Sequence, residues 1–132
     1  MKSSPDPEPQ LFPPGTVLRP KAVNAHAFVV LGNSPDQLQI LTAAWTSLDD
    51  ECPDDECLLG PDDHAEISHP SALALSRARL WDAAKLRQAI VADLIQLRAP
   101  LGPGPLKRIL LDALQSRNLR REWKTLLPLN PS

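Results

Sequence analysis

The sequence is poor in the residues that stabilise small secreted domains or provide strongly reactive groups. It has two cysteines, one methionine, two phenylalanines and no tyrosine among 132 residues. Two cysteines without an apolar leader argue against a disulfide framework and fit a reducing compartment. No apolar run approaches the ~18 residues that a membrane-spanning helix needs. We therefore expect a cytoplasmic protein with one core, formed mainly by aliphatic side chains, and no membrane association.

The common catalytic motifs are also missing. The chain has no Gly-rich phosphate loop and no G-x-S-x-G elbow. Its most acidic stretch, "CPDDECLLGPDDHAEISHPS", lacks the residue order of an EF-hand calcium loop. We therefore predict no cofactor, and any activity has to depend on residues that the fold brings together.

The charges are separated along the chain although the net charge is only −2. Residues 1–75 hold twelve acidic and three basic residues, whereas residues 76–132 hold four acidic and eleven basic ones. One interpretation is that the acidic and basic parts face each other within one fold or across a homodimer. The other is that clustered cations form a surface for RNA or an acidic protein partner. These cations are Arg117, Arg120, Arg121 and Lys124.

Proline content and periodicity divide the chain into three parts. Residues 1–14 contain five prolines and are predicted to be a disordered arm. Residues 15–80 contain short β-prone runs separated by Gly, Pro and Asn, which predicts a small antiparallel β-barrel or sandwich. The expected strands are 16–19, 26–31, 38–46, 57–59, 64–67 and 72–75.

Residues 81–132 have helical periodicity and are predicted to pack on the barrel as two or three helices. Asp82 is the expected N-cap of the first helix, whose apolar stripe is Leu86, Ile90, Leu94 and Leu97. Pro105 suits the first turn of a second helix with its stripe at 106, 109, 110, 113 and 114. A short third helix is expected over 119–127, before Pro128.

Four side chains in the acidic stretch have the chemistry of a zinc site: Cys52, Cys57, His64 and His69. Against this, the two cysteines are separated by four residues rather than two, and their acidic neighbours disfavour thiolate formation. We favour an ordinary acidic loop and predict no bound metal.

The order of these motifs resembles the PemK/MazF-like proteins, in particular an uncharacterised branch of that family. The resemblance rests on "HAFVVLGN", on "QILTAAWTS" and on "CLLGPDDHAEISHPSALALSRARL" followed by a helical tail. It covers about residues 14–121 and implies a small antiparallel barrel with helical additions. It also implies that Asp63, His64, His69 and Ser71 belong to the family pattern, where we expect structural roles for them.

The resemblance implies a metal-independent endoribonuclease of the toxin–antitoxin type. Thr46 and Ser47 match the family's Thr/Ser, and His26 stands at its basic position, followed by alanine where better-known toxins have Arg-Pro. A histidine can transfer a proton but is a poorer fixed cation than arginine. We therefore predict a catalytic pocket with His26, Thr46 and Ser47, assisted by Arg19 or Lys21. The alternative is a catalytically silent barrel that binds an antitoxin, another protein or RNA.

Overall fold

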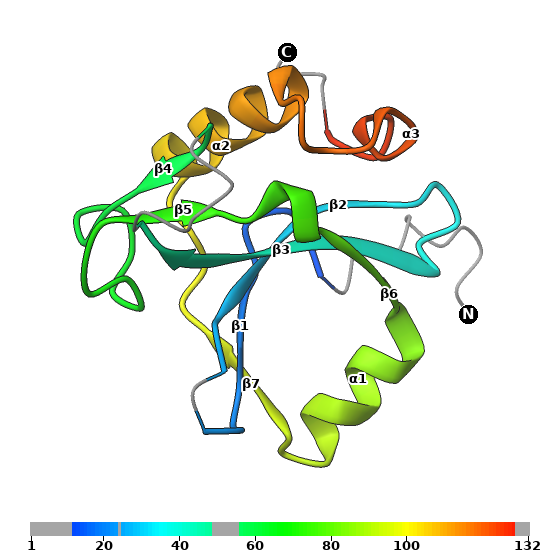
Figure 1. The fold of residues 1–132 in the computed structure, drawn as a ribbon. Coiled ribbons are helices and arrows are strands. Elements are labelled where there is room, and N and C mark those ends of the chain that lie inside the picture. Colours follow the sequence, from blue (N-terminus) through cyan, green and yellow to red (C-terminus); the bar gives the residue numbers. More distant parts are fainter. Residues whose placement is uncertain (1–11, 24, 49–55, 129–132) are drawn as a thin grey trace.

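The computed structural model describes residues 12–23, 25–48 and 56–128. Of the arm predicted over residues 1–14, residues 1–11 lie outside them, whereas Phe12 is buried in the core. The fold is α+β, with one seven-stranded antiparallel sheet, three α-helices and a short 3-10 helix (Figure 1). The elements are β1 (Val17–Pro20), β2 (Phe28–Asn33), β3 (Gln39–Ser47), β4 (Leu58–Leu59), β5 (Ser71–Leu73), η1 (Leu75–Arg77), β6 (Arg79–Asp82), α1 (Ala83–Val91), β7 (Ile95–Arg98), α2 (Pro103–Gln115) and α3 (Arg121–Lys124).

The long strand β3 organises the sheet. On one edge it pairs with β2, and on the other it pairs first with β6 and then, toward its C-terminus, with β5. The pairing order is β4-β5-β3-β2-β1-β7, with β6 branching from β3. Among the described strands β4 and β7 do not pair with each other, so the sheet is open and a closed barrel is not confirmed.

The β2–β3 hairpin follows the sequence prediction closely. Its turn is held by the Ser34 hydroxyl and by the Asp36 carboxylate, which accepts from the backbone N–H of Leu38 at 3.0 Å. Gln37 adopts a positive φ of 61°, so the turn closes without a glycine at that position. The register shifts between Val30 and Gly32, which produces an irregularity where the chain approaches α3.

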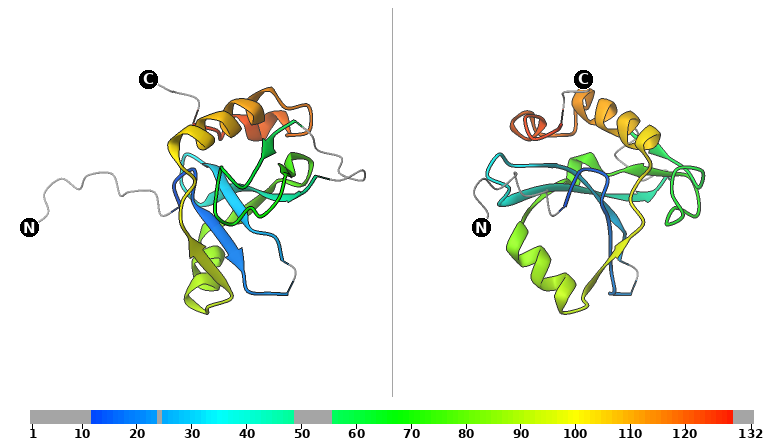
Figure 2. Two further views of the ribbon diagram at one scale, coloured as in Figure 1. Left: turned by 90° about the vertical axis from the view of Figure 1, so that its left-hand side faces the viewer. Right: turned by 180° about the vertical axis from the view of Figure 1, so that it is seen from behind.

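Helices lie on both sides of the sheet (Figure 2). The larger core includes Leu31, Leu41 and Leu73 from the strands, and it packs against Ile109 and Ala113 of α2. A smaller core on the other side includes Phe12, Phe28 and Ile40 and packs against Leu86 of α1. The α2 stripe predicted from the sequence is confirmed, with Ile109 and Ala113 fully buried.

The first helix is shorter than its apolar spacing predicts. Asp82 is its N-cap, as predicted, and accepts from the backbone N–H groups of Ala84 and Lys85. The helix ends at Val91, however, and the prediction that Leu94 and Leu97 continue it is wrong. Asp93 takes a positive φ of 62°, and the following residues form β7, which pairs with β1. Strand pairing here overrides a helical pattern of apolar residues.

Two other predictions need correction in the second half of the sheet. Residues 64–67 form turns rather than a strand. The strand expected over 72–75 is β5, which ends at Leu73 and leads into η1 and then β6, a strand that the sequence did not reveal. α2 begins at Pro103 rather than near Pro105, and α3 covers only Arg121–Lys124. No described helix combines the length and hydropathy required to cross a bilayer.

Candidate active site

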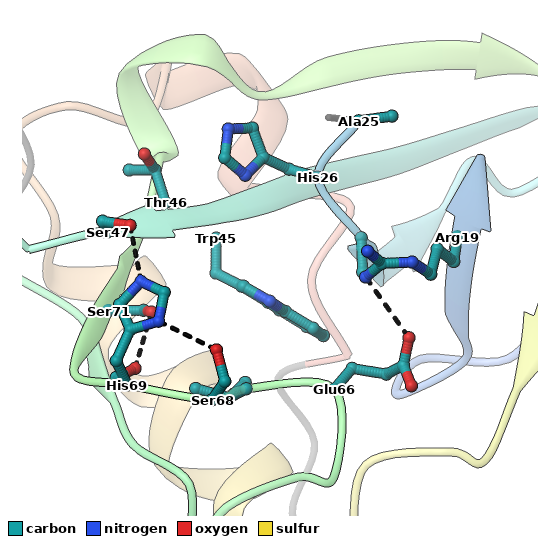
Figure 3. Close-up of a pocket in the computed structure, with 12 residues that line it drawn as sticks. Arg19, Ala25, His26, Trp45, Thr46, Ser47, Glu66, Ser68, His69 and Ser71 are labelled. Atoms are coloured by element: carbon teal, nitrogen blue, oxygen red, sulfur yellow. Dashed lines mark hydrogen bonds and ion pairs between the residues drawn. The ribbon is translucent and has the colours of Figure 1, made fainter. Parts of the chain in front are cut away.

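A pocket of about 160 Å³ opens beside the C-terminal end of β3 (Figure 3). Four segments of the chain surround it: β1, the residues just before β2, the end of β3, and the turns between β4 and β5 with the start of β5. Its lining contains every residue of the predicted catalytic set. The polar lining residues are Arg19, His26, Thr46, Ser47, Glu66, Ser68, His69 and Ser71.

Thr46 and Ser47 reach the pocket because they are the last residues of β3. Their strand partners are Ala72 and Ser71 of β5, so the pairing fixes their backbone. Both side chains remain partly accessible, whereas the preceding Trp45 is buried in the main core. Trp45 therefore contributes packing next to the pocket rather than an open stacking face.

His69 is the least anticipated member of the site. Its Nε2 lies 2.5 Å from the Ser47 hydroxyl, and its Nδ1 lies 2.9 Å from the Ser68 hydroxyl. In a neutral imidazole one nitrogen donates and the other accepts. If Nδ1–H donates to Ser68, Nε2 accepts the Ser47 proton, which is the arrangement of a hydroxyl next to a general base. The Ser71 hydroxyl donates to the His69 carbonyl at 2.9 Å and holds the turn.

His26 enters the pocket from the segment before β2. Its side chain is exposed, and no hydrogen bond to its ring is found within the part of the chain that the structure describes. It is therefore accessible to a ligand from the open side of the pocket. The site thus has two exposed imidazoles, of which only His69 is oriented by hydroxyls among the described residues.

Arg19 provides the positive charge of the pocket, and it belongs to an ion-pair triad. The Glu66 carboxylate contacts Arg19 at 3.4 Å and Arg98 at 3.1 Å. Both guanidinium groups are exposed, while the Glu66 side chain is mostly covered, so two positive charges face one negative charge. Lys21, the other predicted cation, does not line this pocket and instead pairs with Asp93 at 2.6 Å.

Asp63 and His64 make contacts with different segments of the chain. The Asp63 carboxylate contacts Arg108 at 2.9 Å and accepts from the backbone N–H of Gly60. The Arg108 hydrogen bond lowers the pKa of Asp63 and raises the pKa of the guanidinium. The buried His64 has Nε2 at 2.6 Å from the Ala99 carbonyl, while its Nδ1 accepts from the backbone N–H of Glu66. Both groups thus tie the turn segment to its surroundings outside the pocket.

Cys57 is fully buried in the main core. Burial, and to a smaller extent the negative charge of Asp112, raises the pKa of its thiol to about 12. Cys52, the other cysteine of the zinc hypothesis, lies outside the described residues. Among those described, no three His, Cys, Asp or Glu side chains are grouped to hold a metal ion.

The basic C-terminal residues form a separate region around α3. Arg120 stacks on Trp123 at 4.7 Å, and the Lys124 ammonium donates to the Ser116 carbonyl. None of the predicted binding cations Arg117, Arg120, Arg121 and Lys124 lines the pocket. Glu56, at the end of the acidic loop, instead accepts from three groups of residues 116–118. The acidic and basic parts of the chain therefore meet within the fold at this point.

Four contributors to the site were not predicted as such from the sequence. A structural role was expected for His69, and Ser68, Glu66 and Arg98 were not singled out. The "HPS" order was the only sequence signal for His69. No signal identified Arg98, because its place depends on the unforeseen pairing of β7 with β1.

The polar groups around the pocket can move protons and stabilise negative charge at one ligand. Two imidazoles and four hydroxyls supply proton donors and acceptors, and Arg19 supplies a fixed cation. Comparisons with family models, with curated proteins and with solved structures gave no match for this chain.

Proposed function

We propose that the chain is a PemK/MazF-like domain that cleaves RNA without a metal ion. The observation that carries this proposal is that one pocket gathers His26, Thr46 and Ser47 with His69 and Arg19. We also propose that the bent sheet corresponds to the small barrel of that family, opened between β4 and β7. β3 pairs with β6 along its first half and with β5 along its second half, so one strand takes part in both halves of the sheet. This dual pairing supports the interpretation.

The proposed reaction uses the 2′-hydroxyl of the RNA as nucleophile. His69 takes the 2′-hydroxyl proton, the oxygen attacks the adjacent phosphorus, and the bond from phosphorus to the 5′-oxygen breaks. His26 gives a proton to the departing 5′-oxygen. The products are a 2′,3′-cyclic phosphate and a 5′-hydroxyl. General acid–base catalysis of this kind contributes about 10²–10⁴-fold in rate.

His69 is the better candidate for the base because Ser68 and Ser47 hold its ring in one orientation. In this mechanism the substrate hydroxyl takes the place of the Ser47 hydroxyl at Nε2. Arg19 stabilises the charge on the phosphorane, a role for which a guanidinium is well suited. A phosphate that binds Arg19 competes with Glu66, and Arg98 remains as a partner for that carboxylate.

A catalytically silent interaction module is the second candidate. It is favoured by the exposed cations Arg117, Arg120 and Arg121, for which no ion pair is found within the described residues. Such a surface suits an acidic protein partner, including an antitoxin, and would operate without the pocket. The alanine after His26, where the better-known toxins have proline after arginine, also favours this candidate.

Incubation of the purified protein with a long RNA in EDTA tests the proposal. Wild type is expected to cut at restricted positions, and His26→Ala and His69→Ala should each reduce the rate by about 100-fold or more. Arg19→Gln should also slow cleavage, whereas Arg87→Gln on the exposed face of α1 is a matched control that should not. Intact RNA with a cooperatively folded wild type would favour the interaction module.

A further inference from the structure

A second pocket adjoins the first at His26, which belongs to the lining of both. The second pocket has a volume of about 290 Å³. Strands β2, β3 and β6 and the 3-10 helix η1 supply most of its wall. The two pockets are therefore neighbours at His26.

The wall of this second pocket includes an aromatic pair held in a fixed orientation. The rings of Phe28 and Trp81 are stacked, with centroids 5.5 Å apart and planes inclined by 7°. The indole N–H of Trp81 donates to the Thr42 hydroxyl at 3.0 Å, so its polar group is already satisfied. The wall is thus a largely apolar platform in which stacking and one hydrogen bond orient the Trp81 ring.

Two exposed arginines stand beside this platform. Arg77 ends η1, Arg79 begins β6, and the Arg79 guanidinium lies 4.6 Å from the centroid of the Trp81 ring. Within the described residues neither arginine has an ion-pair partner, in contrast to Arg19, Arg98 and Arg108. A guanidinium group without an ion-pair partner can bind a phosphate, and here two of them lie next to an aromatic surface against whose edge the attached base can lie.

We propose that the second pocket is a nucleotide subsite that binds the residue next to the scissile phosphate in single-stranded RNA. This inference rests on the proposed function, because it takes the first pocket as the place of cleavage. Arg77 and Arg79 contact a neighbouring phosphate, and the base lies against the Trp81 edge of the platform. His26 lies where the two subsites adjoin, which is where an acid must stand to protonate the leaving oxygen between two nucleotides.

Binding and cleavage are measured separately to test the subsite. The binding probe is a single-stranded oligonucleotide with 2′-O-methyl groups, which cannot be cut by its own 2′-oxygen. The double variant Arg77→Gln/Arg79→Gln should bind it about tenfold or more weakly. The slope of the logarithm of its binding constant against the logarithm of the salt concentration should become shallower by about 0.7 for each lost phosphate contact. The control is Lys85→Gln/Arg87→Gln, which removes two exposed cations from α1.

The outcomes distinguish this inference from the proposed function. Weaker binding by the Arg77/Arg79 variant but not by the control supports the subsite, whether or not wild type cuts RNA. If wild type binds the probe and both double variants bind it equally well, the subsite is wrong, even if cleavage occurs. If wild type cuts RNA and the Arg77/Arg79 variant keeps the same KM and cleavage positions, the subsite is likewise overturned. A thermal transition equal to that of wild type ensures that each variant is folded.

Discussion

Hydrogen bonds to both ring nitrogens give His69 a defined orientation at the edge of the pocket. The Ser47 hydroxyl comes from the end of β3, and Ser68 is its neighbour in the chain. Both histidines are exposed, but the His26 ring has no such bond among the described residues. This difference between two histidines at one pocket is the basis for assigning the base role to one and the acid role to the other.

Cys57 is expected to be chemically inert in the folded protein. Burial raises the pKa of its thiol to about 12, so almost no thiolate is present near neutral pH. In a Cys52→Ser variant, which leaves a single thiol, an alkylating reagent should react at least a hundredfold more slowly with the native than with the denatured protein. Equal rates would show that this thiol is accessible in the native state.

The same thiol gives a stability trend at alkaline pH. Its folded-state pKa is raised, so its contribution is fully present below the ordinary cysteine pKa and is lost as the pH rises toward 12. Urea unfolding measures the free energy of unfolding of Cys52→Ser and of Cys52→Ser/Cys57→Ala. The difference between the two free energies should narrow or reverse above pH 9. A constant difference would contradict the raised pKa.

At the level of elements, one carboxylate links the acidic segment to the turn between α2 and α3. Glu56 accepts from the Ser116 hydroxyl at 2.6 Å, from the backbone N–H of Arg117 and from the Asn118 amide. These bonds, the Ser116 one foremost, lower the pKa of Glu56. The carboxylate thus orients the turn that leads into α3.

Glu56→Gln should destabilise the protein by about 1–2 kcal/mol, because an amide replaces one of the charged acceptor oxygens with a donor. The matched control is Glu122→Gln on the exposed face of α3, which should change stability by less than about 0.5 kcal/mol. Because the folded-state pKa is lowered, the contribution of Glu56 is present above the ordinary glutamate pKa and disappears as the pH falls through the lowered value. Denaturant unfolding at neutral and acidic pH measures both effects, and a pH-independent difference would contradict this role.

Close approach of the α3 segment to β2 requires a glycine at position 32. A Cβ there would overlap the Leu126 carbonyl oxygen and lie 2.7 Å from its carbon, both backbone atoms that cannot rotate away. Gly32→Ala is therefore expected to cost about 2–4 kcal/mol of unfolding free energy. Gly60→Ala is the control, because nothing lies within 4 Å of the Cβ that it would add. Equal stability of the two variants would mean that the C-terminal segment does not pack on β2.

Across the whole molecule, local patterns predicted some elements well and missed those that depend on distant partners. The β2–β3 hairpin, the Asp82 cap and the α2 stripe followed from turn residues and periodicity. Strand β7 did not, because Leu94 and Leu97 keep helical spacing while their backbone pairs with β1 or leads into that pairing. Local sequence does not encode which distant edge is available for pairing.

In the candidate site, too, some residues could be predicted from the sequence, whereas those that depend on distant partners could not. His26, Thr46 and Ser47 were predicted from the resemblance to the PemK/MazF-like proteins, and the structure brings them to one pocket. Arg98 and Glu66 could not be found in this way, because their contact joins β7 to a turn more than thirty residues earlier. The Arg77 and Arg79 pair was missed because β6 was not predicted. Arg77 and Arg79 stand out only in the folded structure, which shows which carboxylates and aromatic rings lie near each arginine.

The chemical ends left on cleaved RNA test the central claim most directly. Wild type and His69→Ala are incubated with an RNA oligonucleotide in EDTA, and the fragments are identified by mass spectrometry. We expect wild type to give an upstream fragment that ends in a 2′,3′-cyclic phosphate or its 3′-phosphate hydrolysis product, and a downstream fragment with a 5′-hydroxyl. The same oligonucleotide with a 2′-deoxy sugar at the cleavage position should stay intact. Fragments with a 5′-phosphate, cutting of the 2′-deoxy substrate, or uncut RNA with folded wild type would contradict the account.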